Sequence, residues 1–152
     1  MSVLLATNIT IKKIHPLELK DTTYQDQLVN FLFESLEQYT DPVQDIQACL
    51  QYILDEQKGG HIFVAENEIK KISGVVFLCK TRMETFVPEY LLVYIATDKN
   101  MRGQGVGKKL LKAVKEELKA PIALHVEHAN PAKKLYEQVG FTNKYTEMRW
   151  HP

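Results

Sequence analysis

A cluster of glycines and basic residues at positions 101–109, with the sequence MRGQGVGKK, is the stretch of this chain best suited to chemistry. Glycine allows positive φ angles and lets a ligand approach the backbone closely. Apolar residues recur at helical spacing after Gly107, so the cluster is expected to run into a helix whose first N–H groups have no intrahelical partner. Such a helix start favours a bound anion. The cluster therefore predicts a phosphate-binding loop.

The spacing of the glycines excludes two common phosphate loops. A Walker loop would place its first glycine where this chain has Arg102. The dinucleotide fingerprint GxGxxG does not match either. Gly103 and Gly105 could be its first two glycines, but its third glycine would fall at position 108, where this chain has Lys108. The sequence does contain Arg-x-x-Gly-x-Gly, read as Arg102, Gly105 and Gly107.

The segments that follow this motif are equally specific. Residues 110–118 read LLKAVKEEL, residues 123–134 read ALHVEHANPAKK, and residues 135–141 read LYEQVGF. With the apolar stretch before the loop, they resemble in order and length the second half of the GNAT superfamily of acetyl-CoA-dependent N-acetyltransferases. The resemblance spans residues 90–141, and the first half of the chain agrees with the family only in its order of elements.

This resemblance implies that acetyl-CoA is the cosubstrate and that no metal ion takes part. Backbone N–H groups of the glycine cluster, with Lys108, would hold the pyrophosphate, and the edge of the preceding strand would pair with the pantetheine. Asn130 belongs to a motif one residue shorter than the usual form, so we expect it to cap a helix more than to bind the coenzyme. The cofactor-binding residues expected on this basis are Ile95, Ala96, Thr97, Arg102, Gly103, Gln104, Gly105, Val106, Gly107, Lys108, Asn130 and Lys133.

Acetyl transfer from a thioester to an amine needs a neutral nucleophile and a proton for the departing thiolate. Tyr136 matches the tyrosine of LYxxxGF, which in proteins resembling this one is the general acid facing the sulfur. The alternative is a helix tyrosine whose ring belongs to the core. Both can hold, since a buried ring with a polar tip is a common arrangement.

The general base departs from the common family pattern. Many members carry a glutamate in the strand before the loop, where this chain has Val93 and Tyr94. The nearest acidic residue is Glu89, at the entrance of that strand, and it is retained as a candidate.

His125 is the preferred base. The sequence Leu124-His125-Val126 resembles the LHV strand of N-terminal-amine acetyltransferases, in which the histidine is the base and a tyrosine at the position of Tyr90 is its partner. Histidine titrates near neutrality, which suits the task. A hydrogen-bonded strand histidine is the alternative, and Glu127 or His128 could substitute.

Charge is distributed unevenly along the chain, although its net charge is zero. Residues 18–68 contain 11 acidic and 2 basic residues, whereas residues 98–119 contain 7 basic and 3 acidic residues. In proteins resembling this one, the helices expected between Thr23 and Gln57 line the acceptor side of the cleft. We therefore expect a primary amine with a positive charge as acceptor; a solvated acidic surface is the alternative.

The elements needed to position these residues follow from hydrophobic periodicity. A strand at 9–14 precedes a helix at 23–39 and a second helix that has Asp41 as N-cap and Pro42 at its first position and is ended by Gly59-Gly60. Strands are expected at 62–65, 72–79, 90–96 and 122–126, helices after Gly107 and after Pro131, and short strands from Phe141 to Trp150. The continuously apolar run at 90–96 is typical of a central strand covered on both faces. The fold class is α/β or α+β, with a mixed, mostly antiparallel sheet and about four helices in a single domain covering residues 1–152.

Composition bounds the remaining possibilities. The chain has 152 residues, 45% of them hydrophobic, with equal numbers of acidic and basic residues, so nothing in its charge indicates a nucleic-acid or membrane partner. Cys49 and Cys79 are expected to be buried free thiols. The N-terminal apolar run from Val3 to Ala6 is too short for a signal peptide, which favours the cytoplasm. A homodimer is compatible with the sequence, and the alternative to an enzyme is a catalytically silent acyl-CoA-binding module.

Overall fold

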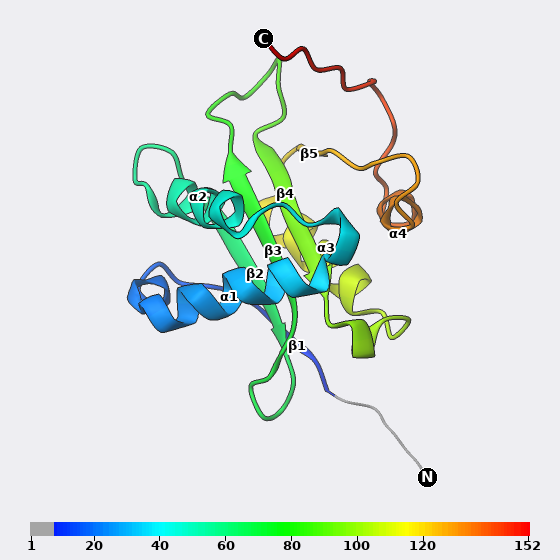
Figure 1. Cartoon of the computed structure of the whole chain (residues 1–152). Coiled ribbons are helices and arrows are strands. Elements are labelled where there is room, and N and C mark those ends of the chain that lie inside the picture. The colour runs from blue at the N-terminus through cyan, green and yellow to red at the C-terminus, as the bar shows by residue number, and fades with distance from the viewer. Residues whose placement is uncertain (1–7) are drawn as a thin grey trace.

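The protein folds around a five-stranded sheet whose spatial order, β1-β2-β3-β4-β5, follows the sequence (Figure 1). The computed structural model describes residues 8–152. Neighbouring strands are antiparallel from β1 to β4, whereas β4 and β5 are parallel. The mixed, mostly antiparallel sheet predicted from the sequence is confirmed. The strands are β1 (Thr10–Lys13), β2 (Gly60–Glu66), β3 (Ile72–Lys80), β4 (Tyr90–Thr97) and β5 (Ile122–Leu124).

Helices cover both faces of the sheet. In Figure 1, α1 and α2 lie in front of the sheet and α3 and α4 lie behind it. Three short 3₁₀-helices, at Glu18–Lys20, Glu37–Tyr39 and Lys99–Met101, complete the connections. The α-helices are α1 (Thr22–Ser35), α2 (Val43–Leu54), α3 (Val106–Leu118) and α4 (Ala132–Gln138).

The sheet separates two hydrophobic cores, one under each helical layer. Leu28 and Ile46, both 0% exposed, belong to the core on the α1 and α2 side, and Leu110 and Val114 belong to the core on the α3 side. Because successive strand residues point to opposite faces, a strand between two cores must be apolar throughout. The structure thus confirms that residues 90–96 form a strand covered on both faces. Each large side chain buried in this way contributes about 1.5–3 kcal/mol.

The first helical region is shorter than its pattern predicts. Asp21 caps α1 by accepting hydrogen bonds from the backbone N–H groups of Thr23, at 2.9 Å, and Tyr24, at 3.4 Å. The helix ends at Ser35 and does not continue to residue 39, because Glu37 adopts a φ of +53°, which breaks the helical path.

The end of the chain differs from the expectation. Residues 141–152 form no strand, although short strands were predicted from Phe141 to Trp150. A strand exists only through pairing, and no described segment pairs with this one. Tyr145, Met148 and Trp150 are consequently 80%, 87% and 82% exposed, and the segment runs along the outside of the molecule from α4 (Figure 1).

Two further observations concern membranes and the N-terminus. Within residues 8–152, no helix combines the length and the apolar character needed to cross a membrane. The apolar run from Val3 to Ala6 lies outside the described residues.

Candidate active site

The glycine cluster forms an open loop between a 3₁₀-helix and α3. Gly103 and Gly105 both have a φ of +81°, which residues with side chains rarely adopt. No heavy atom lies within 4 Å of the position that a Cβ would take at either glycine. Gly105 is the N-cap of α3 and provides no side-chain cap, so the first N–H groups of this helix stay available. The loop has the room and the donors that a phosphate requires.

The other residues of this loop that were predicted to bind the coenzyme differ in which of their groups are accessible to a ligand. Gln104 and Lys108 are exposed side chains, and Lys108 lies in the first turn of α3. Val106 is 2% exposed, with its side chain in the core, so only its backbone could contact a ligand.

Next to this loop, β4 separates from β5. The parallel register pairs Tyr90 with Ile122 and ends where Leu92 pairs with Leu124. On its other side, β4 stays paired with β3 as far as Thr97. Residues 93–97 thus have no strand partner on the β5 side among the described residues, and Ile95, Ala96 and Thr97 lie on this free edge, as required for pairing with a peptide-like pantetheine.

A bulge marks the point of separation. Phe77 pairs with Tyr94 and Leu78 pairs with Leu92, which leaves Val93 as an extra residue in β4. A bulge bends a strand and increases its twist. Val93, the bulge residue, therefore marks the point at which β4 leaves β5.

Gly107 links the loop to the C-terminal motif. A Cβ at this position would lie 2.9 Å from Cδ2 of Leu135 and 3.7 Å from Cγ2 of Thr97. A side chain at position 107 would force the end of the Leu135 side chain to shift, so glycine favours this close packing of α4 against the start of α3. The two halves of the sequence motif, the glycine loop and LYxxxGF, are thus in direct contact.

Arg102 is turned toward α1. Its guanidinium forms an ion pair with Glu37, and Nη2 donates a hydrogen bond to the Ser35 carbonyl at 2.7 Å. The hydrogen bond from Arg102, together with its charge, lowers the pKa of Glu37 below its usual 4.5. The predicted coenzyme ligand therefore ties the loop to the connection between α1 and α2.

Tyr136 is buried on α4, where its ring makes an edge-to-face contact with Phe141 at a centroid distance of 5.9 Å. The residue is 8% exposed, and burial raises the pKa of its hydroxyl to about 12. The hydroxyl forms no hydrogen bond with another described residue. Tyr136 is thus both a core residue and a protonated, unpaired donor, as general acid catalysis requires.

His125 lies at the separation of β4 and β5. It directly follows Leu124, the last residue of β5, and its side chain is exposed without a partner among residues 8–152. Glu127 and His128, in the turn that follows, are exposed too. The structure brings this histidine to the level of Val93, where the free edge begins.

Glu89 and Tyr90 lie at the opposite end of β4. They are separated from the end of the free edge by the length of the strand, which rises by about 3.3 Å per residue. The carbonyl of Glu89 accepts a hydrogen bond from the N–H of Thr81 at 2.9 Å, and the ring of Tyr90 lies 5.6 Å from that of His61. Tyr90 packs with the core on the α3 side, so the structure pairs it with His61 and not with His125.

Asn130 and Lys133 lie at the start of α4. Oδ1 of Asn130 accepts a hydrogen bond from the N–H of Ala132 at 2.9 Å, and its carbonyl accepts one from the N–H of Lys133 at 3.1 Å. The N-cap position of α4 belongs to Pro131, so Asn130 supports the first turn of this helix from one residue before the cap.

Sequence reasoning missed the pairing of Tyr94 with Asp41. The Tyr94 hydroxyl donates a hydrogen bond to Oδ2 of Asp41 at 2.6 Å. Burial of Tyr94 and its bond to Asp41 raise the pKa of the phenol well above its usual value. The N-cap position of α2 belongs to Pro42, so the expectation that Asp41 caps this helix is wrong; its carboxylate binds the strand instead. No local signal connects residues so far apart in the sequence.

Comparison with known proteins identifies the family. A family model described as an acetyltransferase (GNAT) domain matches residues 58–143. The chain belongs to the GNAT family of N-acetyltransferases. No curated protein sequence matched it.

Solved structures similar to this GNAT protein include several acetyltransferases. A Pyrococcus furiosus protein described as an acetyl transferase is 25% identical, with a TM-score of 0.66, and the match covers 95% of this chain and 100% of that one. The aminoglycoside N-acetyltransferase AAC(6')-Iy, solved in complex with CoA, is 17% identical over 99% of both chains, with a TM-score of 0.69. A ribosomal-protein-alanine N-acetyltransferase from Brucella melitensis is 17% identical, with a TM-score of 0.63, over 95% of this chain and 99% of that one.

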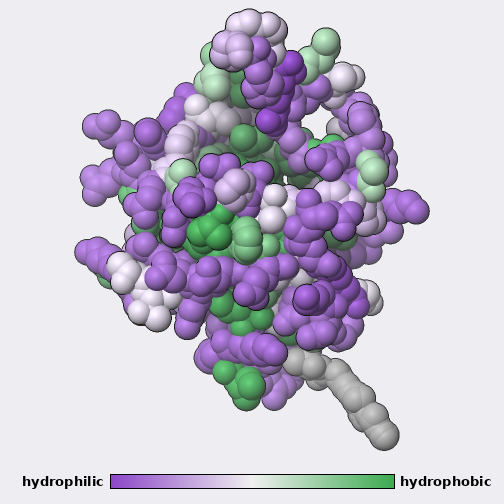
Figure 2. Space-filling view, in the orientation of Figure 1, coloured by the Kyte–Doolittle hydropathy of each residue, from purple (hydrophilic) through white to green (hydrophobic). Residues whose placement is uncertain are grey.

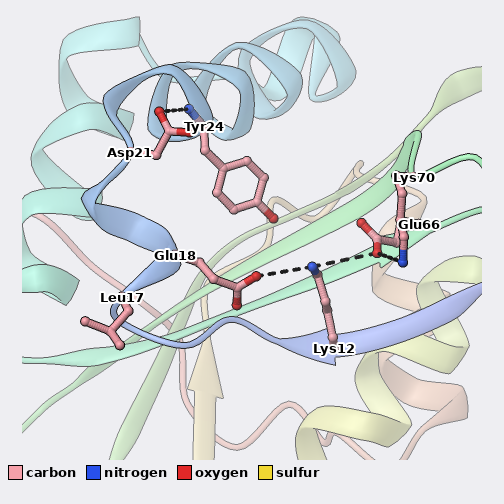
Figure 3. A pocket seen from close by; sticks show the side chains of 7 residues that line it. All are labelled: Lys12, Leu17, Glu18, Asp21, Tyr24, Glu66 and Lys70. Atoms are coloured by element: carbon pink, nitrogen blue, oxygen red, sulfur yellow. Dashed lines mark hydrogen bonds and ion pairs between the residues drawn. The ribbon is translucent and has the colours of Figure 1, made fainter.

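The pocket drawn in Figure 3 is separate from the glycine loop of this GNAT domain. Its volume is about 450 Å³, and it lies at the start of α1. Arg102 meets the other end of that helix, about 20 Å away for a helix of this length. Glu66, 6% exposed, lies 3.7 Å from Nζ of Lys12 and 3.4 Å from Nζ of Lys70. The lining residues are Lys12, Leu17, Glu18, Asp21, Tyr24, Glu66 and Lys70.

The face of the GNAT domain that carries α1 and α2 is mainly hydrophilic. Figure 2 shows this face, with hydrophobic side chains visible between the two helices. No Lys or Arg occurs between Asp21 and Gln57 in the sequence of these helices. Within residues 8–152, no three His, Cys, Asp or Glu side chains come together as a metal site would require.

Proposed function

We propose that this GNAT protein transfers an acetyl group from acetyl-CoA to a primary amine by direct attack of the amine on the thioester. The observation that carries the proposal is the continuity of two binding surfaces. The free edge of β4 at residues 93–97 leads into the open loop and uncapped start of α3. The strand edge suits the amide groups of pantetheine, and the helix start suits the pyrophosphate.

Tyr136 is the proposed general acid. Since burial raises the pKa of its hydroxyl to about 12, the phenol stays protonated at neutral pH and is available to the departing thiolate. Since a thiol with a pKa near 8.5 is a stronger acid than this phenol, Tyr136 would assist its departure by donating a hydrogen bond to the developing thiolate. Acetyl-CoA, when bound, would supply the activated acyl group, and coenzyme A would leave as the thiol.

His125 is the proposed general base. An acceptor ammonium with a pKa of about 10.4 is mostly charged at pH 7, and its deprotonation there costs roughly 4–5 kcal/mol. An exposed histidine at the point where β4 leaves β5 is placed to take this proton, directly or through water.

The proposed acceptor carries a positive charge, as a polyamine, a lysine side chain or a basic peptide does. The connection between α1 and α2 places Asp41 against Tyr94 of β4, on a surface formed by a sequence region with 11 acidic and 2 basic residues between 18 and 68. Such a field raises the local concentration of a cation and its association rate.

The decisive experiment measures thiol release from acetyl-CoA with a panel of amines. Each cationic acceptor is paired with a neutral amine of similar size, and KM is compared at low and physiological salt. We expect turnover with cationic amines and a KM that rises with ionic strength. A preferred neutral or anionic acceptor, or a KM indifferent to salt, would contradict the acceptor proposal alone.

The alternative is a catalytically silent acyl-CoA-binding module, favoured by the presence of Val93 and Tyr94 where many relatives carry a glutamate. Tight binding of acetyl-CoA without turnover on any amine would support this module and overturn the enzymatic proposal.

A further inference from the structure

The two cysteines of this chain, the only ones it contains, are in contact. Cys49 lies on α2 and Cys79 on β3, separated by 30 residues in the sequence. Their Sγ atoms are 3.6 Å apart and form a weak hydrogen bond, and both thiols are free. The thiols are free, as expected, but they are half-buried and not buried, and the structure adds that they face one another.

The backbones on both sides of this pair are held by independent contacts. The hydroxyl of Tyr52, one turn after Cys49, donates a hydrogen bond to the carbonyl of Lys80 at 2.6 Å. The N–H of Lys80, which follows Cys79, donates to the carbonyl of Gly59 at 3.0 Å. The approach of the two sulfurs is therefore built into the packing of α2 on β3.

The pair is also suited to nucleophilic sulfur chemistry. Both cysteines are half-buried, so a small oxidant can reach them. The hydrogen bond from Cys49 lowers the pKa of Cys79, whereas this bond and burial raise the pKa of Cys49. Cys79 is thus the sulfur that ionises first and attacks, since the thiolate is the reactive form.

We propose that Cys49 and Cys79 are a site of reversible oxidation, at which hydrogen peroxide forms an intramolecular disulfide that ties α2 to β3. The Cys79 thiolate attacks one peroxide oxygen, the O–O bond breaks, and hydroxide leaves and is protonated to water. The sulfur of Cys49 then attacks the resulting sulfenic acid, forming the S–S bond, while the sulfenic oxygen leaves as a second water. Two thiols are oxidised by two electrons, and one peroxide is reduced to two waters.

Only a small movement of the two sulfur atoms is needed to form the disulfide. A disulfide bond is about 2.05 Å long, so the sulfurs must approach by roughly 1.5 Å from their present 3.6 Å. The bond would fix α2, which begins two residues after Asp41, against the sheet whose strand β4 carries Tyr94. Oxidation would therefore restrain the helix next to the proposed acceptor side.

The test treats the reduced full chain with near-stoichiometric hydrogen peroxide, in buffer and, as the control, in denaturant. Remaining thiols are then alkylated in denaturant and the intact mass is measured. We expect a monomer that has lost two hydrogens, takes up no alkylating agent, and is restored by a dithiol. We further expect the native chain to form it at least about 10-fold faster than the unfolded chain, because the native contact holds the sulfurs together.

Two Cys→Ser variants complete the test. Cys49→Ser and Cys79→Ser each remove one sulfur, and neither should yield the species that lacks two hydrogens. A native rate no greater than the unfolded rate would overturn the proposal. So would sulfinic acids, disulfide-linked dimers or two alkylated thiols as the products from the native wild-type chain. The wild-type measurement stands even where a variant fails to fold.

Discussion

The hydroxyl of Tyr94 lies 2.6 Å from Oδ2 of Asp41, so a strand residue and a residue of the connection between α1 and α2 share one hydrogen bond across 53 positions of sequence. Tyr94 comes directly after the bulge residue of β4, at the start of the free edge. The bond therefore sets where the acidic connection lies relative to the proposed site of acetyl transfer.

Tyr94→Phe removes this bond and keeps the ring. We expect a loss of about 1 kcal/mol, measured as a fall in Tm of roughly 2–4 °C, and a higher KM for a cationic acceptor with unchanged acetyl-CoA affinity. The matched control is Tyr52→Phe, which removes the 2.6 Å hydrogen bond between Tyr52 and the Lys80 carbonyl. An equal rise of KM in both variants, or in neither, would contradict a role of Tyr94 in placing Asp41.

The ion pair between Arg102 and Glu37 predicts a pH-dependent contribution to stability. Since the pKa of Glu37 is lowered in the folded chain from its usual 4.5, the contribution is fully present above pH 4.5 and is lost as pH falls through the lowered value. Glu37→Gln should thus lower Tm at pH 7 and have little effect at a pH below the lowered pKa, where the wild-type carboxyl is protonated in the folded chain as well. A difference between variant and wild type that is the same at both pH values would argue against the pair.

Gly105→Glu tests the phosphate loop. The substitution places a side chain at a φ of +81° and a negative charge next to the start of α3, so acetyl-CoA binding should be lost in calorimetry. Gly59→Glu is the matched control, because Gly59 has a φ of +88° and precedes β2, away from the loop. The variant at position 59 should bear a similar backbone strain of about 1–2 kcal/mol and bind normally. Wild-type affinity in a folded Gly105→Glu variant would disprove the assignment.

Tyr136→Phe tests the general acid. Turnover should fall by about 10²- to 10⁴-fold while acetyl-CoA binding stays near that of the wild type, since the ring is kept. Because the pKa of Tyr136 is raised to about 12, its ionisation should add no alkaline limb to the wild-type rate profile below about pH 11. An unchanged rate, with chemistry shown to be limiting, would leave Tyr136 a packing residue only.

His125→Ala tests the general base. The rate should fall, and the acid-side limb of the pH profile that a base acting in its neutral form produces should disappear. His128→Ala is the matched control and should keep the limb. If the limb survives in His125→Ala but vanishes when Glu89 or Glu127 is replaced by Gln, a carboxylate handles the proton instead.

Much of the fold was predictable because its signals are local. The apolar stripe after Gly107, the run at 90–96 and the spacing from Arg102 to LYEQVGF placed α3, β4 and α4 correctly. The predictions were wrong where contacts between distant parts of the chain determine the local structure. The segment 141–150, predicted to form short strands, has no strand partner, and the left-handed Glu37 that ends α1 early is a residue type with no special preference for that conformation.

The same division holds for the candidate site. The glycine loop was predicted from its glycines and spacing, whereas the free edge at Ile95 to Thr97 and the position of Tyr136 were implied by the resemblance to the GNAT family. The bulge at Val93 did not, because a bulge depends on the register with β3. The partners of Arg102 and Tyr94 lie more than fifty positions away in sequence and carry no local mark.

Arg102 gives the molecule a thermodynamic connection between its two halves. One guanidinium serves both the rim of the glycine loop and the end of α1, so an anion in the loop and the Glu37 carboxylate compete for the same charge. An acetyl donor that attracts the Arg102 guanidinium would weaken its contacts with Glu37 and the Ser35 carbonyl, in the segment that leads to Asp41. By linkage, an acceptor that changes this segment alters donor affinity by the same factor.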